Sequence, residues 1–260
     1  MKIFNSSQGN SPLVVSMPHN GEAIPPSIAA DMQPFALDVR DTDWKLDQLY
    51  SFLGAMDVTV IAGRLSRYVI DLNRPADDRS LYPGADTTGL CPDTSFDKQP
   101  IYRQGRKPDP EAVRSRITRY WQPYHEQLQS ELHRIRQDHG YALLLDAHTI
   151  ASRVPRFFEG QLPDFNLGTN DGRSCAPGLQ NALARLDFSP YSQVTNGRFK
   201  GGYITRAYGD PDQNIHAVQL ELSQATYMDE KLRVVDETKL SQVQPHLRYL
   251  VLALLAWKPD

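Results

Sequence analysis

The residues best suited to metal chemistry are His19 and Glu22, which follow an apolar, β-branched run at 13–17. Such a run predicts a buried strand, and Pro18 ends it because proline lacks the N–H that a central strand needs. An imidazole and a carboxylate at this spacing can bind one Zn²⁺. Since His-x-x-Glu pairs also occur by chance as hydrogen-bonded loop residues, the pair indicates a metal site only if further ligands follow.

His148 and Glu221 occupy matching positions at two later predicted strands. The almost entirely apolar run 141–145 leads to His148, and the alternating run 216–222 contains Glu221. A continuous apolar run is typical of parallel strands buried on both faces. Each residue also has an ordinary interpretation, as a histidine bonded to a backbone carbonyl and as a solvated carboxylate. The apolar neighbours of Glu221 favour burial, and a buried carboxylate requires a partner or a metal.

Together these residues predict a catalytic zinc site. Two imidazoles and one carboxylate leave one position on zinc open, as in carboxypeptidase A, which the arrangement resembles. We expect His19, Glu22 and His148 to bind one zinc ion per chain, and Glu221 to act as general base toward water. Asp146, on the same side of its strand as His148, is expected to orient an imidazole. The same ligands also suit other divalent ions.

Length and composition suit one globular domain over residues 1–260. A chain of 260 residues with 40% hydrophobic and 23% charged residues can bury a large core. Helices are expected at 41–54, at 111–139 with a break near Pro123, and at 236–257, and a further strand at 68–72. Strands buried between helices predict an α/β fold with a parallel sheet.

Charge and targeting signals exclude several classes of partner. The net charge of −3 and the lack of a basic block give no reason to expect binding to nucleic acid or to an acidic membrane surface. The longest apolar stretch, 249–257, is about half of a membrane span. The first residues lack an apolar signal segment, and Cys91 and Cys175 have the context of free thiols. We therefore expect a cytoplasmic protein.

Four separated motifs resemble the N-formylglutamate amidohydrolase family. They are SMPHNGE at 16–22, SRYVIDLNR at 66–74, LLDAH at 144–148 and GGYITR at 201–206, in family order. The resemblance extends from about residue 12 to 225. It implies the three-layer α/β/α fold of the related zinc carboxypeptidases (zinc exopeptidase, phosphorylase/hydrolase-like), with a mixed, mostly parallel central sheet. It also implies hydrolysis of N-formyl-L-glutamate to formate and L-glutamate in histidine degradation.

The same resemblance suggests which residues bind the substrate. Asn73 and Arg74 resemble the Asn-Arg pair with which zinc carboxypeptidases hold a terminal carboxylate, and Arg67 and Arg206 lie in the matching motifs. A dianionic N-acyl amino acid suits planar guanidinium groups, which bind carboxylates with two hydrogen bonds. We expect Asn73, Arg74 and Arg206 to bind substrate and Arg67 to stabilise the oxyanion. The sequence leaves open which arginine has which role.

Two alternatives remain open. The first is a related zinc hydrolase that acts on another N-acyl amino acid or on a peptide C-terminus, and a tight pocket around the smallest acyl group would argue against it. The second is a catalytically inactive module that keeps the fold and the metal. The presence of a general base beside a complete ligand set argues against the second alternative.

Overall fold

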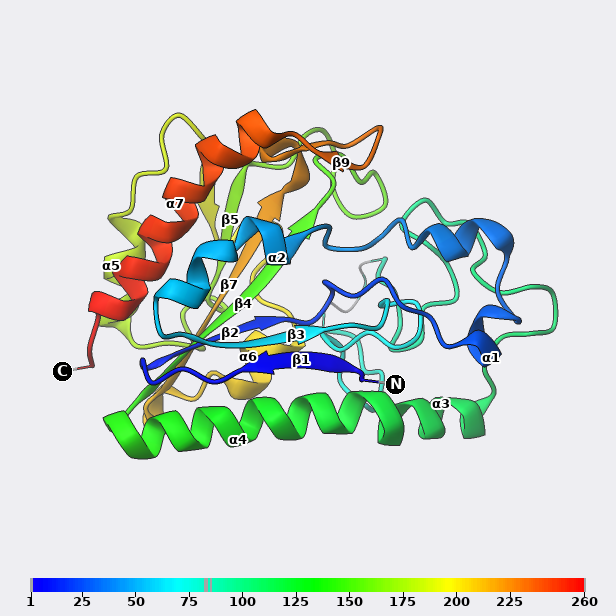
Figure 1. Cartoon of the computed structure of the whole chain (residues 1–260), viewed down its shortest axis with the longest axis horizontal. Coiled ribbons are helices and arrows are strands. Elements are labelled where there is room, and N and C mark those ends of the chain that lie inside the picture. Colours follow the sequence, from blue (N-terminus) through cyan, green and yellow to red (C-terminus); the bar gives the residue numbers. More distant parts are fainter. Residues whose placement is uncertain (1, 82–83, 85, 260) are drawn as a thin grey trace.

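The computed structural model describes residues 2–81, 84 and 86–259, and its central element is a mixed sheet (Figure 1). The described residues contribute seven strands to this sheet, in the order β1-β3-β2-β4-β7-β5-β6. The strands are β1 (Phe4–Ser7), β2 (Leu13–Met17), β3 (Thr59–Gly63), β4 (Ala142–Ile150), β5 (Phe165–Gly168), β6 (Gln193–Thr195) and β7 (Ile215–Ser223). Strands β3, β2, β4 and β7 are mutually parallel, whereas β1 runs antiparallel to β3. Strand β5 is antiparallel to β7 and parallel to β6. The predicted mixed, mostly parallel sheet is confirmed.

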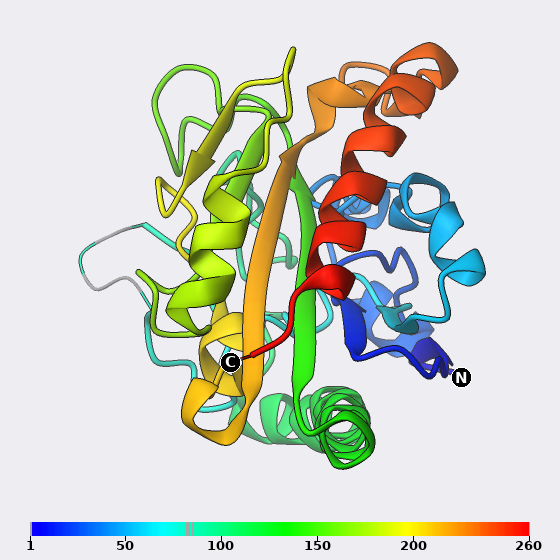
Figure 2. The same cartoon turned by 90° about the vertical axis from the view of Figure 1, so that its left-hand side faces the viewer.

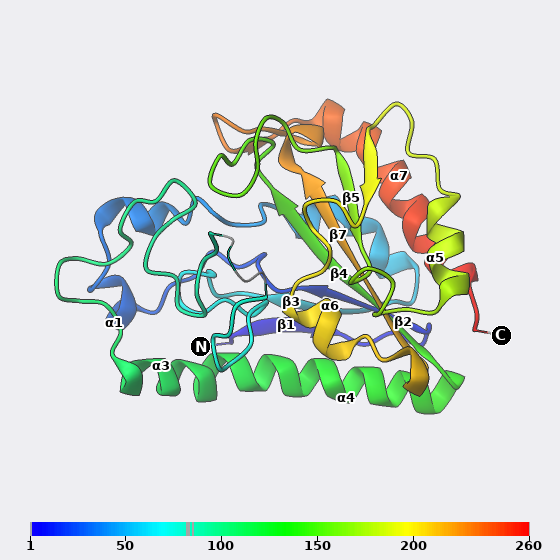
Figure 3. The same cartoon turned by 180° about the vertical axis from the view of Figure 1, so that it is seen from behind.

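Helices cover both faces of this sheet. The α-helices are α1 (Pro26–Ala29), α2 (Leu46–Leu49), α3 (Pro110–Arg116), α4 (Gln122–His139), α5 (Pro177–Ala184), α6 (Tyr203–Tyr208) and α7 (Glu237–Ala256). Shorter elements are the 3₁₀ turns η1 (Pro34–Asp38), η2 (Ser51–Ala55), η4 (Pro211–Gln213) and η5 (Gln224–Thr226), the π-helical turn η3 (Ile117–Trp121), and the hairpin β8 (Met228–Asp229) and β9 (Val234–Val235). Helices α2 and α7 lie on one side of the sheet, and α4 and α6 lie on the other (Figures 2 and 3). None of the helices in the described ranges combines the length and apolarity needed to cross a membrane.

The pairing of β4 with β7 positions the polar residues of both strands. All residues of both strands are buried, as their apolar sequences predict. The parallel register places His148 beside Glu221 and Asp146 beside Gln219. Residues two apart on a strand share a face, so these four side chains all point to the side covered by α4 and α6.

The predicted strand at 68–72 is wrong. This segment is buried but irregular, and its backbone groups bond to partners other than a neighbouring strand. Arg116 donates to the carbonyl of Val69, and His125 Nε2 donates to the carbonyl of Leu72. Because side chains satisfy these carbonyls, the apolar segment can cross the interior without joining the sheet.

The helix predicted at 41–54 is mostly absent. Only α2 and η2 form there, and Lys45, the residue before α2, lies in the left-handed region with φ of 56°. The first turn is capped from outside by Asn20, whose side-chain oxygen accepts from the N–H of Leu46. Asp43, which precedes α2, is turned into the interior, where it is 2% exposed.

The long helix predicted at 111–139 is divided just before Pro123, as expected, and the division is the π-helical turn η3. Two side chains from this region hold the irregular segment that precedes it in the sequence. Trp121 Nε1 donates to the carbonyl of Arg74 at 2.9 Å, and His125 Nε2 donates to the carbonyl of Leu72 at 2.9 Å. In this role His125 is only 4% exposed.

Burial of His125 predicts an acid-sensitive contribution to stability. Burial lowers the pKa of His125 to about 3, although its bond to the carbonyl of Leu72 opposes the shift. Below about pH 6.5 the unfolded chain protonates this imidazole and the folded chain does not, so stability falls as the pH falls from there toward 3. Between pH 6 and 5, the free energy of unfolding should fall by about 1 kcal/mol more in the unaltered protein than in His125→Gln.

Urea unfolding of both proteins at several pH values, with a chelator present, measures this difference. Equal pH dependence in the two proteins would contradict the prediction.

Candidate active site

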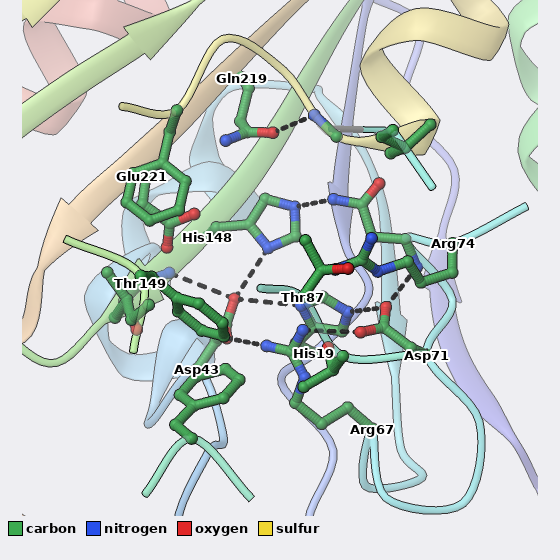
Figure 4. Close-up of a pocket in the computed structure, with 18 of the residues that line it drawn as sticks. His19, Asp43, Arg67, Asp71, Arg74, Thr87, His148, Thr149, Gln219 and Glu221 are labelled. Carbon is green, nitrogen blue, oxygen red and sulfur yellow. Dashed lines mark hydrogen bonds and ion pairs between the residues drawn. The ribbon is translucent and has the colours of Figure 1, made fainter. Parts of the chain in front are cut away.

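Three buried side chains converge where β2 and β4 end (Figure 4). His19, Asp43 and His148 each offer one ligand atom, and these atoms lie within 4.8 Å of one another. Asp43 Oδ2 lies 2.9 Å from His148 Nδ1 and 3.7 Å from His19 Nδ1. It also accepts a hydrogen bond from the backbone N–H of Thr149 at 3.2 Å. The cluster brings together the two histidines that the sequence identified, with a carboxylate that it did not.

Glu22 lies outside this cluster, so the structure does not bring together the ligand set predicted from the sequence. Its side chain is 46% exposed and its Oε1 lies 2.7 Å from Lys45 Nζ. The chain turns away after His19, because Gly21 packs against the backbone of residues 64–65 and Ala23 donates to the carbonyl of Arg64. The candidate ligands are therefore His19, Asp43 and His148.

Each imidazole of the cluster has an outer polar partner. His19 Nε2 lies 2.7 Å from Asp71 Oδ1, and His148 Nε2 lies 3.1 Å from Asp146 Oδ1. Both rings thus turn Nδ1 toward Asp43 and Nε2 toward a carboxylate. Histidines that bind metals commonly donate their other ring N–H to a carboxylate. Asp146 lies in the position expected of an orienting residue, and Asp71 has the same relation to the other ring.

The electrostatics of the cluster suit a bound cation. His19 Nδ1 is buried and has no hydrogen-bond partner within the described part of the chain. Burial, together with Arg67, lowers the pKa of His19 and favours a neutral imidazole. Burial opposes protonation of His148, but Asp146 and Asp43 outweigh it and raise the pKa of His148 well above its usual value. The site therefore stabilises positive charge beside Asp43, and its nitrogen and oxygen ligands fit a divalent ion such as zinc.

Glu221 lies next to His148 on the neighbouring strand. It is 8% exposed, and among the described residues none hydrogen-bonds to its carboxylate. Burial raises the pKa of Glu221 to about 8, against the field of His148. A carboxylate whose pKa lies near neutrality can both accept and release a proton, which is the property of a general acid–base group.

Arg67 lies beside the cluster and is held by a carboxylate. Its Nη2 lies 2.6 Å from Asp71 Oδ2, and its guanidinium stacks over Phe96 at 4.9 Å from the ring centre. Burial opposes the charge of Asp71, but Arg67 and His19 hold the pKa of that carboxyl well below its usual range. Asp71 therefore connects a candidate metal ligand with a cationic group, a role the sequence did not reveal.

A cavity of about 100 Å³ opens onto these residues. Three arginines line it, Arg67, Arg74 and Arg198, and its apolar wall is formed by Leu81, Phe96, Ile150, Phe157 and Phe199. Arg206 does not line it, and its Nε donates to the carbonyl of Gly201 at 2.8 Å. The glycine-rich segment at 196–211 thus contributes an arginine to the cavity, but the arginine is Arg198.

Asn73, predicted to bind substrate, borders the cavity with its amide already engaged. Its Nδ2 lies 2.9 Å from His148 Nε2, and its Oδ1 accepts from the N–H of Ile204 at 2.7 Å. Arg74, its neighbour, reaches the cavity as expected.

Known proteins resemble this chain over nearly its whole length. The N-formylglutamate deformylase of Pseudomonas aeruginosa is 47% identical over 259 residues, which cover 98% of this chain and 97% of that protein. The N-formylglutamate deformylase of Pseudomonas putida is 48% identical with the same coverage. The crystal structure of N-formylglutamate amidohydrolase from Ralstonia eutropha JMP134 has a TM-score of 0.84 at 28% identity, over 98% of this chain and 97% of that one.

A gene product of Agrobacterium tumefaciens, at 18% identity, shares the fold with a TM-score of 0.72 over 98% of this chain and 95% of its own. The family described as N-formylglutamate amidohydrolase matches residues 11–228. These matches confirm the resemblance found in the separated motifs. The chain belongs to the N-formylglutamate amidohydrolase family.

Proposed function

We propose that this protein is a zinc-dependent amidohydrolase that cleaves N-formyl-L-glutamate to formate and L-glutamate, a step of histidine degradation. The observation that carries the proposal is the convergence of His19, Asp43 and His148 beside Glu221 in a small cavity lined by arginines. Relatives named N-formylglutamate deformylase, identical at nearly half of their positions, support the same substrate.

The chain's own residues account for the proton transfers of amide hydrolysis. When bound by His19, Asp43 and His148, zinc would supply a Lewis acid that polarises the formyl oxygen and makes water more acidic. Glu221 takes a proton from the attacking water while the water oxygen bonds to the formyl carbon. It then delivers that proton to the amide nitrogen as the C–N bond breaks. Arg67 stabilises the negative charge that develops on the formyl oxygen.

The two carboxylates of the substrate match two arginines of the cavity. We assign Arg74 to the α-carboxylate, following its resemblance to the carboxylate-binding arginine of zinc carboxypeptidases, and Arg198 to the side-chain carboxylate. Arg198 lines the cavity together with Phe157 and Phe199, and its Nε donates to the carbonyl of Phe157 at 2.5 Å. Arg206, outside the cavity, supports the same glycine-rich segment through the carbonyl of Gly201.

The apolar wall supports a small acyl group. Phe96, Phe157 and Phe199 limit a cavity of about 100 Å³, and the rings of Phe96 and Phe157 pack edge to face at 4.8 Å. A larger acyl group would require these packed rings to move, which costs free energy. Formyl is the smallest acyl group and needs no such movement.

The direct test is formate release from N-formylglutamate by the zinc-loaded protein. We expect turnover, loss of turnover on removing zinc with a chelator, and recovery on adding it back. Glu221→Gln keeps the size of the side chain but cannot accept a proton, so kcat should fall by at least ~10²-fold while zinc stays bound.

N-acetylglutamate and N-formylmethionine should be poor substrates. Turnover of either one at the rate of N-formylglutamate would indicate a general N-acyl hydrolase, and no turnover of any N-acyl amino acid would indicate a binding module.

The ligand set is tested by exchanging its carboxylates. Asp43→Asn removes the charge that faces both imidazoles, and we expect zinc affinity to fall by at least ~100-fold, since a lost ligand costs more than a lost outer partner. Glu22→Gln is the matched control, because Glu22 is exposed and paired with Lys45. Elemental analysis and chelator competition measure both variants. Zinc loss in Glu22→Gln with retention in Asp43→Asn would restore the ligand set expected from the sequence.

Substrate selectivity tests the assignment of Arg198. In Arg198→Gln, kcat/KM for N-formylglutamate should fall by at least ~30-fold, the equivalent of about 2 kcal/mol for a buried charged pair. N-formylglutamine lacks the side-chain charge, so its kcat/KM should change much less. Arg206→Gln is the control and should leave the ratio between the two substrates unchanged. If Arg206→Gln abolishes that ratio and Arg198→Gln does not, the two roles are reversed.

A further inference from the structure

We propose that Asn73 is a positioning residue that joins the imidazole of His148 to the glycine-rich segment carrying Arg198, and that it does not bind a substrate carboxylate. Asn73 borders the cavity and precedes Arg74, so its position alone would suit either role. The contacts of its amide distinguish them. The activity part of the test rests on the proposed function, whereas the metal part does not.

The oxygen of the Asn73 amide is fixed by a backbone donor. Oδ1 accepts from the N–H of Ile204, in the first turn of α6, at 2.7 Å. A backbone N–H can only donate, so the oxygen faces α6 and the nitrogen faces the opposite way.

The nitrogen of the same amide faces the candidate metal site. Nδ2 lies 2.9 Å from His148 Nε2 and 3.4 Å from Asp146 Oδ2. Asp146 Oδ2 also accepts from the hydroxyl of Thr205, a second link from α6 to the same carboxylate. An amide nitrogen can only donate. With a metal at Nδ1, Nε2 of His148 carries a proton and cannot accept, so the amide acts on the ring through Asp146, whose Oδ1 lies 3.1 Å from Nε2. The far nitrogen of that ring, Nδ1, points to Asp43.

The glycine-rich segment packs directly on this amide. A Cβ atom added to Gly202 would lie 2.3 Å from Asn73 Nδ2, so a side chain at this position would displace the amide. The N–H of Gly202 donates to Gln219 Oε1 at 2.6 Å, which ties the segment to β7 two residues before Glu221. The segment that carries Arg198 is thereby held against the groups that orient His148.

These contacts give the two roles different consequences. A carboxylate ligand lost from the site raises KM and leaves the metal site intact, as expected for Arg74. A positioning residue lost from beside His148 loosens the ring and lowers metal affinity, because outer partners of ligating histidines contribute to binding. Asn73 has the contacts of the second kind.

The experiment compares Asn73→Ala with Arg74→Ala, using zinc titration against a chromophoric chelator and steady-state kinetics. For Asn73→Ala we expect zinc affinity to fall by at least about 10-fold, and the KM of the fully zinc-loaded variant to stay within about threefold. For Arg74→Ala we expect unchanged zinc affinity and a raised KM. Unchanged zinc affinity with a raised KM in Asn73→Ala would overturn the proposal.

Gly202→Ala provides a second, independent variant. The added methyl group displaces the Asn73 amide without removing any polar group, so zinc affinity should again fall. In the double variant the loss should not exceed that of Asn73→Ala alone, because both changes disturb one interaction. Additive losses would mean that the two residues act separately and would overturn the link.

If Asn73→Ala fails to fold, as judged by thermal unfolding without metal, Gly202→Ala decides alone. Zinc binding without formate release in the unaltered protein would refute the proposed function but not this inference.

Discussion

The burial of the Asp43 carboxylate is the constraint on which the rest of the site depends. A buried charge is costly unless donors or opposite charges surround it. Here His148 and the N–H of Thr149 donate to Oδ2, His19 lies within 3.7 Å, and Arg67 lies 3.9 Å from Oδ1. Despite burial, these partners lower the pKa of Asp43, so it remains an anion that can attract a cation. The residues that compensate this charge are also those with candidate roles in binding and catalysis.

One irregular segment supplies most of that compensation, and this explains why it is not a strand. Between residues 67 and 74, Arg67 and Arg74 reach the cavity, whereas Asp71 and Asn73 contact the outer nitrogens of the two histidines. A strand would send alternate residues to opposite faces of a sheet and could not direct all four toward one site. An irregular segment can direct all four toward one site, provided that side chains such as Trp121 and His125 donate to the backbone carbonyls that no strand pairs with.

The sequence predicted the elements whose hydrophobic pattern is sufficient to define them. Strands β2, β4 and β7 and helix α7 follow from apolar runs, and with them the neighbouring positions of His19, His148 and Glu221. Residues on loops were harder, because their direction depends on distant contacts. Glu22 turns outward through packing at Gly21, which no local pattern reveals. The choice between Arg198 and Arg206 likewise depends on how one glycine-rich segment folds back on β7.

The geometry also explains why substrate recognition and the metal site cannot vary independently. Gln219 binds the glycine-rich segment and Glu221 faces the cavity from the same strand, on the same face. Asp146 and His148 have the same relation on β4, beside α6. The segment that carries Arg198 is therefore connected by hydrogen bonds to Gln219 and Asp146, the residues two positions before the candidate base Glu221 and the candidate ligand His148. In the function we propose, the contacts that hold Arg198 in place for the second carboxylate also hold the groups assigned to the amide bond, which favours precision for one dianionic substrate.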